Sequence, residues 1–110
     1  MNKFKFIYDK DVDSLTIYKE NRKTHWSIRF GDMIIDLDKN YNISAIEILN
    51  PDSLFQIPKK LLNQISSVSL KVYNRGNILV MLILLRFKSV EEASKLLLPL
   101  PLEKPIKIKV

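Results

Sequence analysis

Hydrophobic and polar residues alternate along five short segments in the first half of the chain, and turn residues separate these segments. A repeat of two residues is typical of β-strands that bury one face. Strands that follow one another after such short turns pair most simply with their neighbours. The pattern therefore predicts an antiparallel meander built from residues 3–9, 14–20, 24–30, 33–38 and 43–49.

The second half begins with a segment whose apolar residues recur at nearly helical spacing. This spacing predicts a helix over 54–66, and Pro58 places the start of its regular part near Ile57, because proline is tolerated best in a first turn. The following residues, 69–87, read as a β-hairpin. Its turn contains Gly76, which is free to adopt a positive φ.

The last quarter of the chain predicts one more helix and one more strand. Ser89 and Glu92 have the spacing of a capping box, which predicts a short helix over 89–98 that Pro99 ends. The alternation in 105–110 predicts a terminal strand. The expected fold class is α+β: an antiparallel β-meander sheet followed by a helix, a β-hairpin, a second short helix and a terminal strand.

The length of 110 residues suits one compact domain, 1–110. The net charge is +6, and all of this excess lies in the second half, because residues 1–50 hold eight basic and eight acidic residues. We therefore expect a neutral β-meander, 1–50, with a basic α/β extension, 51–110, packed on it.

The strand predicted near 78–87 is apolar on both faces until Arg86. A small chain covers one face of a sheet more easily than both, and an uncovered apolar face invites aggregation. We therefore expect a homodimer formed about a two-fold axis. The self-association candidates are Leu79, Met81, Ile83 and Leu85. The alternative is a monomer in which the two predicted helices cover opposite faces.

Composition removes several kinds of chemistry. The chain has no cysteine, which excludes disulfides and thiolate chemistry and fits a cytoplasmic protein. Its one histidine, His25, cannot build a multi-histidine zinc site. The longest apolar run, 78–85, is too short to cross a bilayer. We expect no catalytic, cofactor-binding or metal-binding residue, no cofactor and no membrane partner.

Three aspartates alternate near the N-terminus, and their spacing is close to that of a calcium-binding helix–loop–helix. Asp9, Asp11 and Asp13 would be the first ligands, and Glu20 would be the last. Ser14 stands where such a loop normally has glycine, and the residues after it prefer a strand. The segment is therefore expected to be a polar hairpin turn.

Two stretches, "FIYDKDVDSLTIY" and "MIIDLDKNYNISAIEILNPDS", resemble the uncharacterised family called domain of unknown function 2283. The resemblance covers about residues 4–53. It implies an antiparallel sheet followed by a helix, and it makes Asp9 and Asp13 part of a fold signature. Tyr41 stands at the family's turn glycine, so Asn40 is expected to supply any positive φ. The resemblance brings no assigned activity, and it suggests a regulatory or antitoxin-like role.

Five carboxylates could gather at one end of the sheet and do acid–base work or hold magnesium. The other interpretation is that they cap turns and pair across strands. These residues are Asp9, Asp13, Asp36, Asp38 and Glu47.

Basic side chains of the second half could meet phosphates, although no known nucleic-acid-binding motif is visible. The candidates are Lys59, Lys60, Lys71, Arg75, Arg86 and Lys88. The sequence thus predicts a small non-enzymatic protein-interaction module that self-associates and has a possible further protein partner. The alternative is a sequence-independent nucleic-acid-binding protein, and an enzyme is the third candidate.

Overall fold

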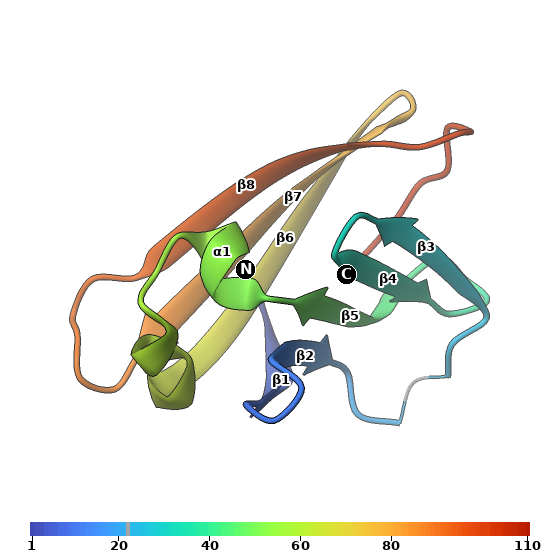
Figure 1. Ribbon diagram of the computed structural model, residues 1–110. Coiled ribbons are helices and arrows are strands. Elements are labelled where there is room, and N and C mark those ends of the chain that lie inside the picture. Colours follow the sequence, from blue (N-terminus) through green and yellow to red (C-terminus); the bar gives the residue numbers. More distant parts are fainter. Residues whose placement is uncertain (22) are drawn as a thin grey trace.

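A computed structural model describes residues 1–21 and 23–110, and it consists mainly of one curled antiparallel sheet (Figure 1). The spatial order of the eight strands is β3-β4-β5-β2-β1-β6-β7-β8. Their bounds are β1 Asn2–Asp9, β2 Ser14–Tyr18, β3 Trp26–Phe30, β4 Met33–Leu37, β5 Ile43–Leu49, β6 Ile65–Arg75, β7 Ile78–Phe87 and β8 Ser94–Pro101.

The five strands predicted for the first half are confirmed as β1 to β5. Each buries the face that its alternation indicates, so that Met33, Ile35 and Leu37 of β4 point into the core. The predicted hairpin is confirmed as β6 and β7, and Gly76 in its turn has a φ of +60°. Period-two alternation was a sufficient signal here because one face of each strand is more buried than the other.

The α+β prediction is wrong, because the described residues form mostly strands and only two short helices. The helix predicted over 54–66 is replaced by α1 (Pro51–Phe55) and by the 3₁₀ helix η1 (Lys59–Gln64), and β6 already begins at Ile65. Two local features break the helical pattern. Gln56 has a φ of 54°, which ends α1, and Pro58 disfavours helical geometry at the residue before it.

The second helix, predicted over 89–98, is also wrong, because Ser94–Pro101 forms β8 against β7. Its residues alternate between less and more exposed positions, which is the period of a strand. The Ser89 hydroxyl donates to Gln64 Oε1 across the fold, so it does not cap a local helix. Pairing with the very apolar β7 outweighed the helix propensity of a leucine-rich segment.

The terminal strand predicted over 105–110 is wrong as well, since this segment makes only an isolated bridge, between Lys109 and Asn42. It crosses the open end of the curl from β8 to the start of β5 (Figure 1). The Asn74 side chain donates to the Ile108 carbonyl at 2.7 Å and accepts from the Ile108 amide at 2.9 Å. The segment therefore holds the tip of the β6–β7 hairpin to the other half of the sheet.

The core fills the inside of the curl, and both halves of the chain contribute to it. Leu79, Met81, Ile83 and Leu85 are 0% exposed there. The prediction that these side chains form a surface for a second copy is therefore corrected: the chain's own sheet covers them. Neither helix of the described residues has the length and apolar character needed to cross a membrane.

The turn before β5 departs from the prediction in one backbone detail. Tyr41 itself has a φ of 63°, so the positive φ is not taken by Asn40. The Tyr41 ring stacks on Trp26, with ring centroids 4.7 Å apart and planes 8° from parallel. Stacking and burial favour an aromatic residue at a position whose backbone geometry would suit glycine.

Candidate functional site

The five carboxylates proposed as a possible site are distributed over separate turns and strands. Asp9 accepts from the Asp11 amide at 3.0 Å, and Asp38 accepts from the Asn40 amide at 2.9 Å. Glu47 accepts from the Ser14 hydroxyl at 3.3 Å. No group of three metal-ligating side chains comes together among the residues that the structure describes. These contacts are those of turn capping and cross-strand pairing.

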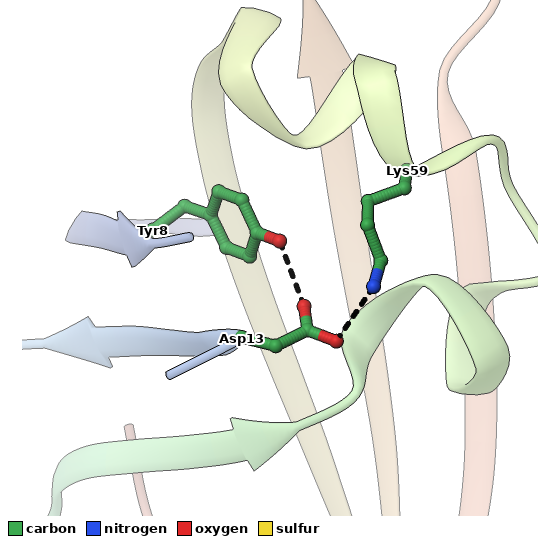
Figure 2. Close-up of polar contacts among 3 residues, drawn as sticks. All are labelled: Tyr8, Asp13 and Lys59. Carbon is green, nitrogen blue, oxygen red and sulfur yellow. Dashed lines mark hydrogen bonds and ion pairs between the residues drawn. The ribbon is translucent and has the colours of Figure 1, made fainter. Parts of the chain in front are cut away.

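Asp13 joins a network that reaches across the chain (Figure 2). The Tyr8 hydroxyl donates to Asp13 at 2.7 Å, and the Lys59 ammonium approaches the other carboxylate oxygen at 3.0 Å. The Asp13 carbonyl accepts from the Asn50 amide at 3.0 Å. The turn before β2 is thereby tied both to the end of β5 and to η1.

The electrostatics of this network favour a structural role. The hydrogen bond to Asp13 raises the pKa of Tyr8 to about 12, so its hydroxyl stays protonated at neutral pH. The hydrogen bonds from Tyr8 and Lys59 lower the pKa of the Asp13 carboxyl, and the same contact raises the pKa of Lys59. A base for catalysis needs a pKa near the working pH, and each of these three shifts points away from it.

The six basic candidates for nucleic-acid binding do not form one cluster. Lys71, Arg75 and Arg86 lie on the outer face of β6 and β7, because they alternate with buried residues of those strands. Lys59 and Lys60 lie on η1, and Lys88 lies beside its end, where its amide donates to the Gln64 carbonyl at 2.8 Å. Only the first three share a sheet face that could follow a phosphate backbone.

The outer face of β7 and β8 carries an apolar strip beside these cations. Ile78 is 41% exposed and Leu97 is 62% exposed; Pro99 is also exposed, and Val80, Leu82 and Leu84 are half-buried. This outer apolar strip consists of Ile78, Val80, Leu82, Leu84, Leu97 and Pro99. The sequence had indicated that β7 is apolar on both faces, and the outer face is the one that reaches solvent.

The two edges of the sheet differ in how their backbone is presented. At the β8 edge, the Leu102 amide donates to the Asn77 carbonyl at 2.7 Å. The backbone amides and carbonyls of the even-numbered residues in this segment therefore face β7. Pro99 and Pro101 therefore stand at the outward positions, where they have no amide to offer. The short helix α1 also contacts β8. This edge is poorly suited to pair with another strand.

The other edge, β3, pairs only with β4 within the described chain and contains no proline. Its hairpin to β4 has the two-residue turn Gly31–Asp32, and Phe30 lies opposite Met33. In such a hairpin the flanking pair exchanges hydrogen bonds, and the pattern repeats every second residue. The amides of Ile28 and Phe30 thus face β4, and those of Ser27 and Arg29 face away from the sheet.

A cleft of about 510 Å³ runs along this open edge. Four consecutive residues, 27–30, line one side, and successive residues of a strand point to opposite faces. A cleft that touches all four therefore follows the edge of β3. Its opposite wall is formed by residues 101–104 and 106.

Charged residues line both sides of the cleft: Arg29 lines one side, and Glu103 and Lys104 line the other. Arg29 is exposed, and its Nε donates to the Gly31 carbonyl at 3.0 Å. Asp36 lies opposite Ser27 on β4, and its carboxylate accepts a hydrogen bond from the Ser27 hydroxyl at 2.7 Å. Reasoning from the sequence did not single out Ser27, Ile28 or Arg29. The sequence of this strand contains no proline, but that fact points to a site only when the strand is known to lie at the edge of the sheet.

Comparison with known proteins finds a family match over part of the chain. Residues 5–50 match the family described as "Protein of unknown function (DUF2283)". The resemblance expected from the sequence is thereby confirmed for β1 to β5, and no such match accompanies residues 51–110. β3 and its hairpin partner β4 lie inside the matched region.

Two curated relatives each match about half of the chain. The chain is 40% identical over 57 residues to an uncharacterized protein of Methanocaldococcus jannaschii, covering 52% of this chain and 49% of that protein. It is 36% identical over 61 residues to a Methanosarcina mazei protein named "Putative hypoxanthine phosphoribosyltransferase", covering 56% of this chain and 50% of that protein. The chain thus spans about half the length of the curated relatives it matches. No solved structure matches.

Proposed function

We propose that this protein is a non-enzymatic interaction module that binds a protein partner by adding a strand to β3. The observation that carries the proposal is the contrast between the two sheet edges. Edge strands attract other strands, and proteins normally block them with proline, charge or a covering element. Here β8 is blocked by Pro99 and Pro101, whereas β3 offers its outward amides and carbonyls beside a cleft.

Strand addition needs main-chain groups for affinity and side-chain pockets for specificity. The outward amides and carbonyls of Ser27 and Arg29 supply the main-chain groups. The cleft supplies the side-chain pocket, which is lined by the half-buried side chains of Ile28, Phe30 and Ile106. An incoming strand would add its own apolar residues to this inner side and its polar residues to the outer side.

The proposal does not include catalysis. The two glycines of the chain, Gly31 and Gly76, both lie in hairpin turns, so no glycine-rich loop is present to cradle a phosphate. The name of the Methanosarcina mazei relative belongs to a protein of which half is matched. An activity on a nucleobase or a phosphorylated sugar is therefore not transferred to this chain.

Two matched variants test strand addition. Arg29→Pro removes an outward amide from the open edge, and Lys95→Pro removes an outward amide from the blocked edge. We expect immobilised wild-type protein and Lys95→Pro to capture the same partner from a lysate of the native host, and Arg29→Pro to lose it. Capture of that partner by Arg29→Pro at wild-type yield would contradict the proposal.

Sequence-independent nucleic-acid binding is the second candidate, and the shared outer face of Lys71, Arg75 and Arg86 favours it. A gel-shift with mixed DNA and RNA at low salt tests it. The candidate predicts a shift that weakens with salt and in Lys71→Glu/Arg86→Glu. Absence of binding at low salt would remove this candidate and leave strand addition unaffected.

A further inference from the structure

The geometry of β3 points to one particular partner: we infer that a second copy of this chain adds its own β3 antiparallel to the first, about a two-fold axis through Ile28. This inference rests on the proposed function and names the strand that is added. The homodimer expected from the sequence is thus placed at β3, because the inner side chains of β7 are buried within one chain.

The backbone permits this pairing in few registers. The outward amides and carbonyls belong to Ser27 and Arg29, so these residues of one copy must face the same two residues of the other. With the axis through Ile28, Ser27 lies opposite Arg29 of the second copy and Arg29 lies opposite Ser27. A shift of two residues would set arginine opposite arginine or remove Arg29 from the pairing. The central register uses the whole strand and avoids like charges.

Charge complementarity favours the same register. Asp36 and Ser27 already form one row of the outer face, joined by the 2.7 Å hydrogen bond. In the dimer, Arg29 of the second copy would extend this row on the far side of Ser27. Its long side chain would reach across Ser27 toward the Asp36 carboxylate, and the two-fold axis would repeat the contact. Opposite charges in one cross-strand row stabilise a sheet.

Apolar side chains would meet along the inner face. Ile28 would lie beside Ile28 of the second copy, and Trp26 would lie beside its Phe30. Positions outside hydrogen-bonded pairs bring their Cβ atoms closest, which suits such contacts. Trp26 is 40% exposed in the single chain, and the other two are half-buried. The dimer would remove part of this surface from water.

The assembly would stop at two copies. Pairing of β3 with β3 uses the same surface on both partners and closes about the axis, whereas pairing of β3 with β8 would continue into a filament. Pro99 and Pro101 oppose the second arrangement, because they offer no amides at the outer edge of β8. The difference between the two edges therefore suits a closed dimer.

The first test is the mass in solution, measured by light scattering after gel filtration over a range of protein concentrations. We expect wild-type protein and Lys95→Pro to approach twice the 12.9 kDa chain mass, and Arg29→Pro to remain a monomer. A monomeric wild type over the whole range, or a dimeric Arg29→Pro, would overturn the inference. A monomeric wild type with Arg29-dependent capture of a different protein would overturn only the inference and leave the proposed function standing.

The second test uses charges, so it does not depend on how Arg29→Pro folds. Arg29→Asp and Asp36→Arg should each weaken the dimer by about tenfold or more, because like charges then share a row. The double variant Arg29→Asp/Asp36→Arg should recover most of the wild-type affinity. Double-variant binding as weak as that of the single variants would overturn the proposed register. Lys3→Asp on β1, far from β3 in the sheet order, is the matched control and should leave the dimer unchanged.

Discussion

The edges β3 and β8 of one sheet present opposite backbone chemistry. Along β8, Pro99 and Pro101 occupy outward positions, and α1 lies against the strand. Along β3, Ser27 and Arg29 direct amides into a cleft. Both edges belong to the same sheet, and the proposed strand addition explains why only one of them carries prolines.

This difference teaches where to look for function in a protein without an obvious catalytic site. An open edge is an aggregation hazard, and a chain can remove the hazard with a single proline. β8 carries two prolines at outward positions, whereas β3 carries none and has Arg29 as its charged residue. An edge without proline that persists beside an edge with two is explained by the proposed strand that pairs with it.

The largest predicted effect is a loss of stability, and it tests whether the dimer forms through β3 or through β7. Ile83→Asp buries a charge at a site that is 0% exposed, so we expect it to destabilise the fold by more than about 4 kcal/mol. Leu97→Asp, at a site 62% exposed, should change stability by less than about 1 kcal/mol. Urea denaturation measures both. If Ile83→Asp is folded but monomeric, the dimer interface lies at β7 and not at β3.

A smaller effect tests the direction of the amides on β3. Ile28→Pro removes an amide that bonds β4 and should cost about 3 kcal/mol, whereas Arg29→Pro should cost about 1 kcal/mol or less. On the other edge, Leu98→Pro removes an amide that faces β7 and should cost more stability than Lys95→Pro, which removes an outward amide. Equal losses for the neighbouring residues Ile28 and Arg29 would show that the assignment of outward groups is wrong.

Removing the protection of β8 should make the two edges alike. In Pro99→Thr/Pro101→Thr, the outer edge of β8 regains amides that can pair with another strand. We expect species larger than a dimer to form slowly at high protein concentration, detected by light scattering. Adding Arg29→Pro to this variant should prevent those assemblies that join β8 to β3. An unchanged mass for the double threonine variant would mean that the prolines do not guard this edge.

The smallest effect concerns the Tyr8–Asp13–Lys59 network, which should act on stability and leave association unchanged. The Asp13 pKa is lowered from 3.8, so its contribution to stability is present above pH 3.8 and is lost as the pH falls through the folded-state value. The Tyr8 pKa is raised from 10.0 to about 12, so its contribution is present below pH 10 and is lost as the pH rises toward 12.

Tyr8→Phe removes both contributions of this hydrogen bond. We expect a Tm a few degrees below that of the wild type near neutral pH, and a smaller difference at both extremes of pH. Tyr73→Phe, on the outer face of β6, is the control. A difference between Tyr8→Phe and wild type that is constant from acid to alkaline pH would contradict the role given to Asp13.

Part of this fold was predictable from sequence, and the reason is local. In β1 to β5, one face is more buried than the other, and this difference leaves a period of two in the residues themselves. Ser94–Pro101 has the same period, but its leucines and the capping pattern at Ser89 favour a helix when neighbouring strands are not considered. The strand forms because β7, apolar on both faces, pairs with it, and that contact is not local.

The candidate site was less predictable than the fold. Asp9 and Asp13 attracted attention as acids, yet their roles are those of turn residues. Ser27 and Arg29 look ordinary in the sequence, and they become candidates only because β3 lies at an edge. Strand order depends on pairings such as Phe4 with Val68, which join the two halves of the chain and leave no local signal.

Amide hydrogen exchange at the two edges, followed by NMR at low and high protein concentration, tests the central claim most directly. Backbone amides that pair with a strand of the second copy exchange more slowly as the dimer population grows. The account predicts that the Ser27 and Arg29 amides become protected as concentration rises, while the Lys95 and Leu97 amides of β8 exchange equally fast at both concentrations. Fast exchange of Ser27 and Arg29 at every concentration, or new protection on β8 instead, would contradict it.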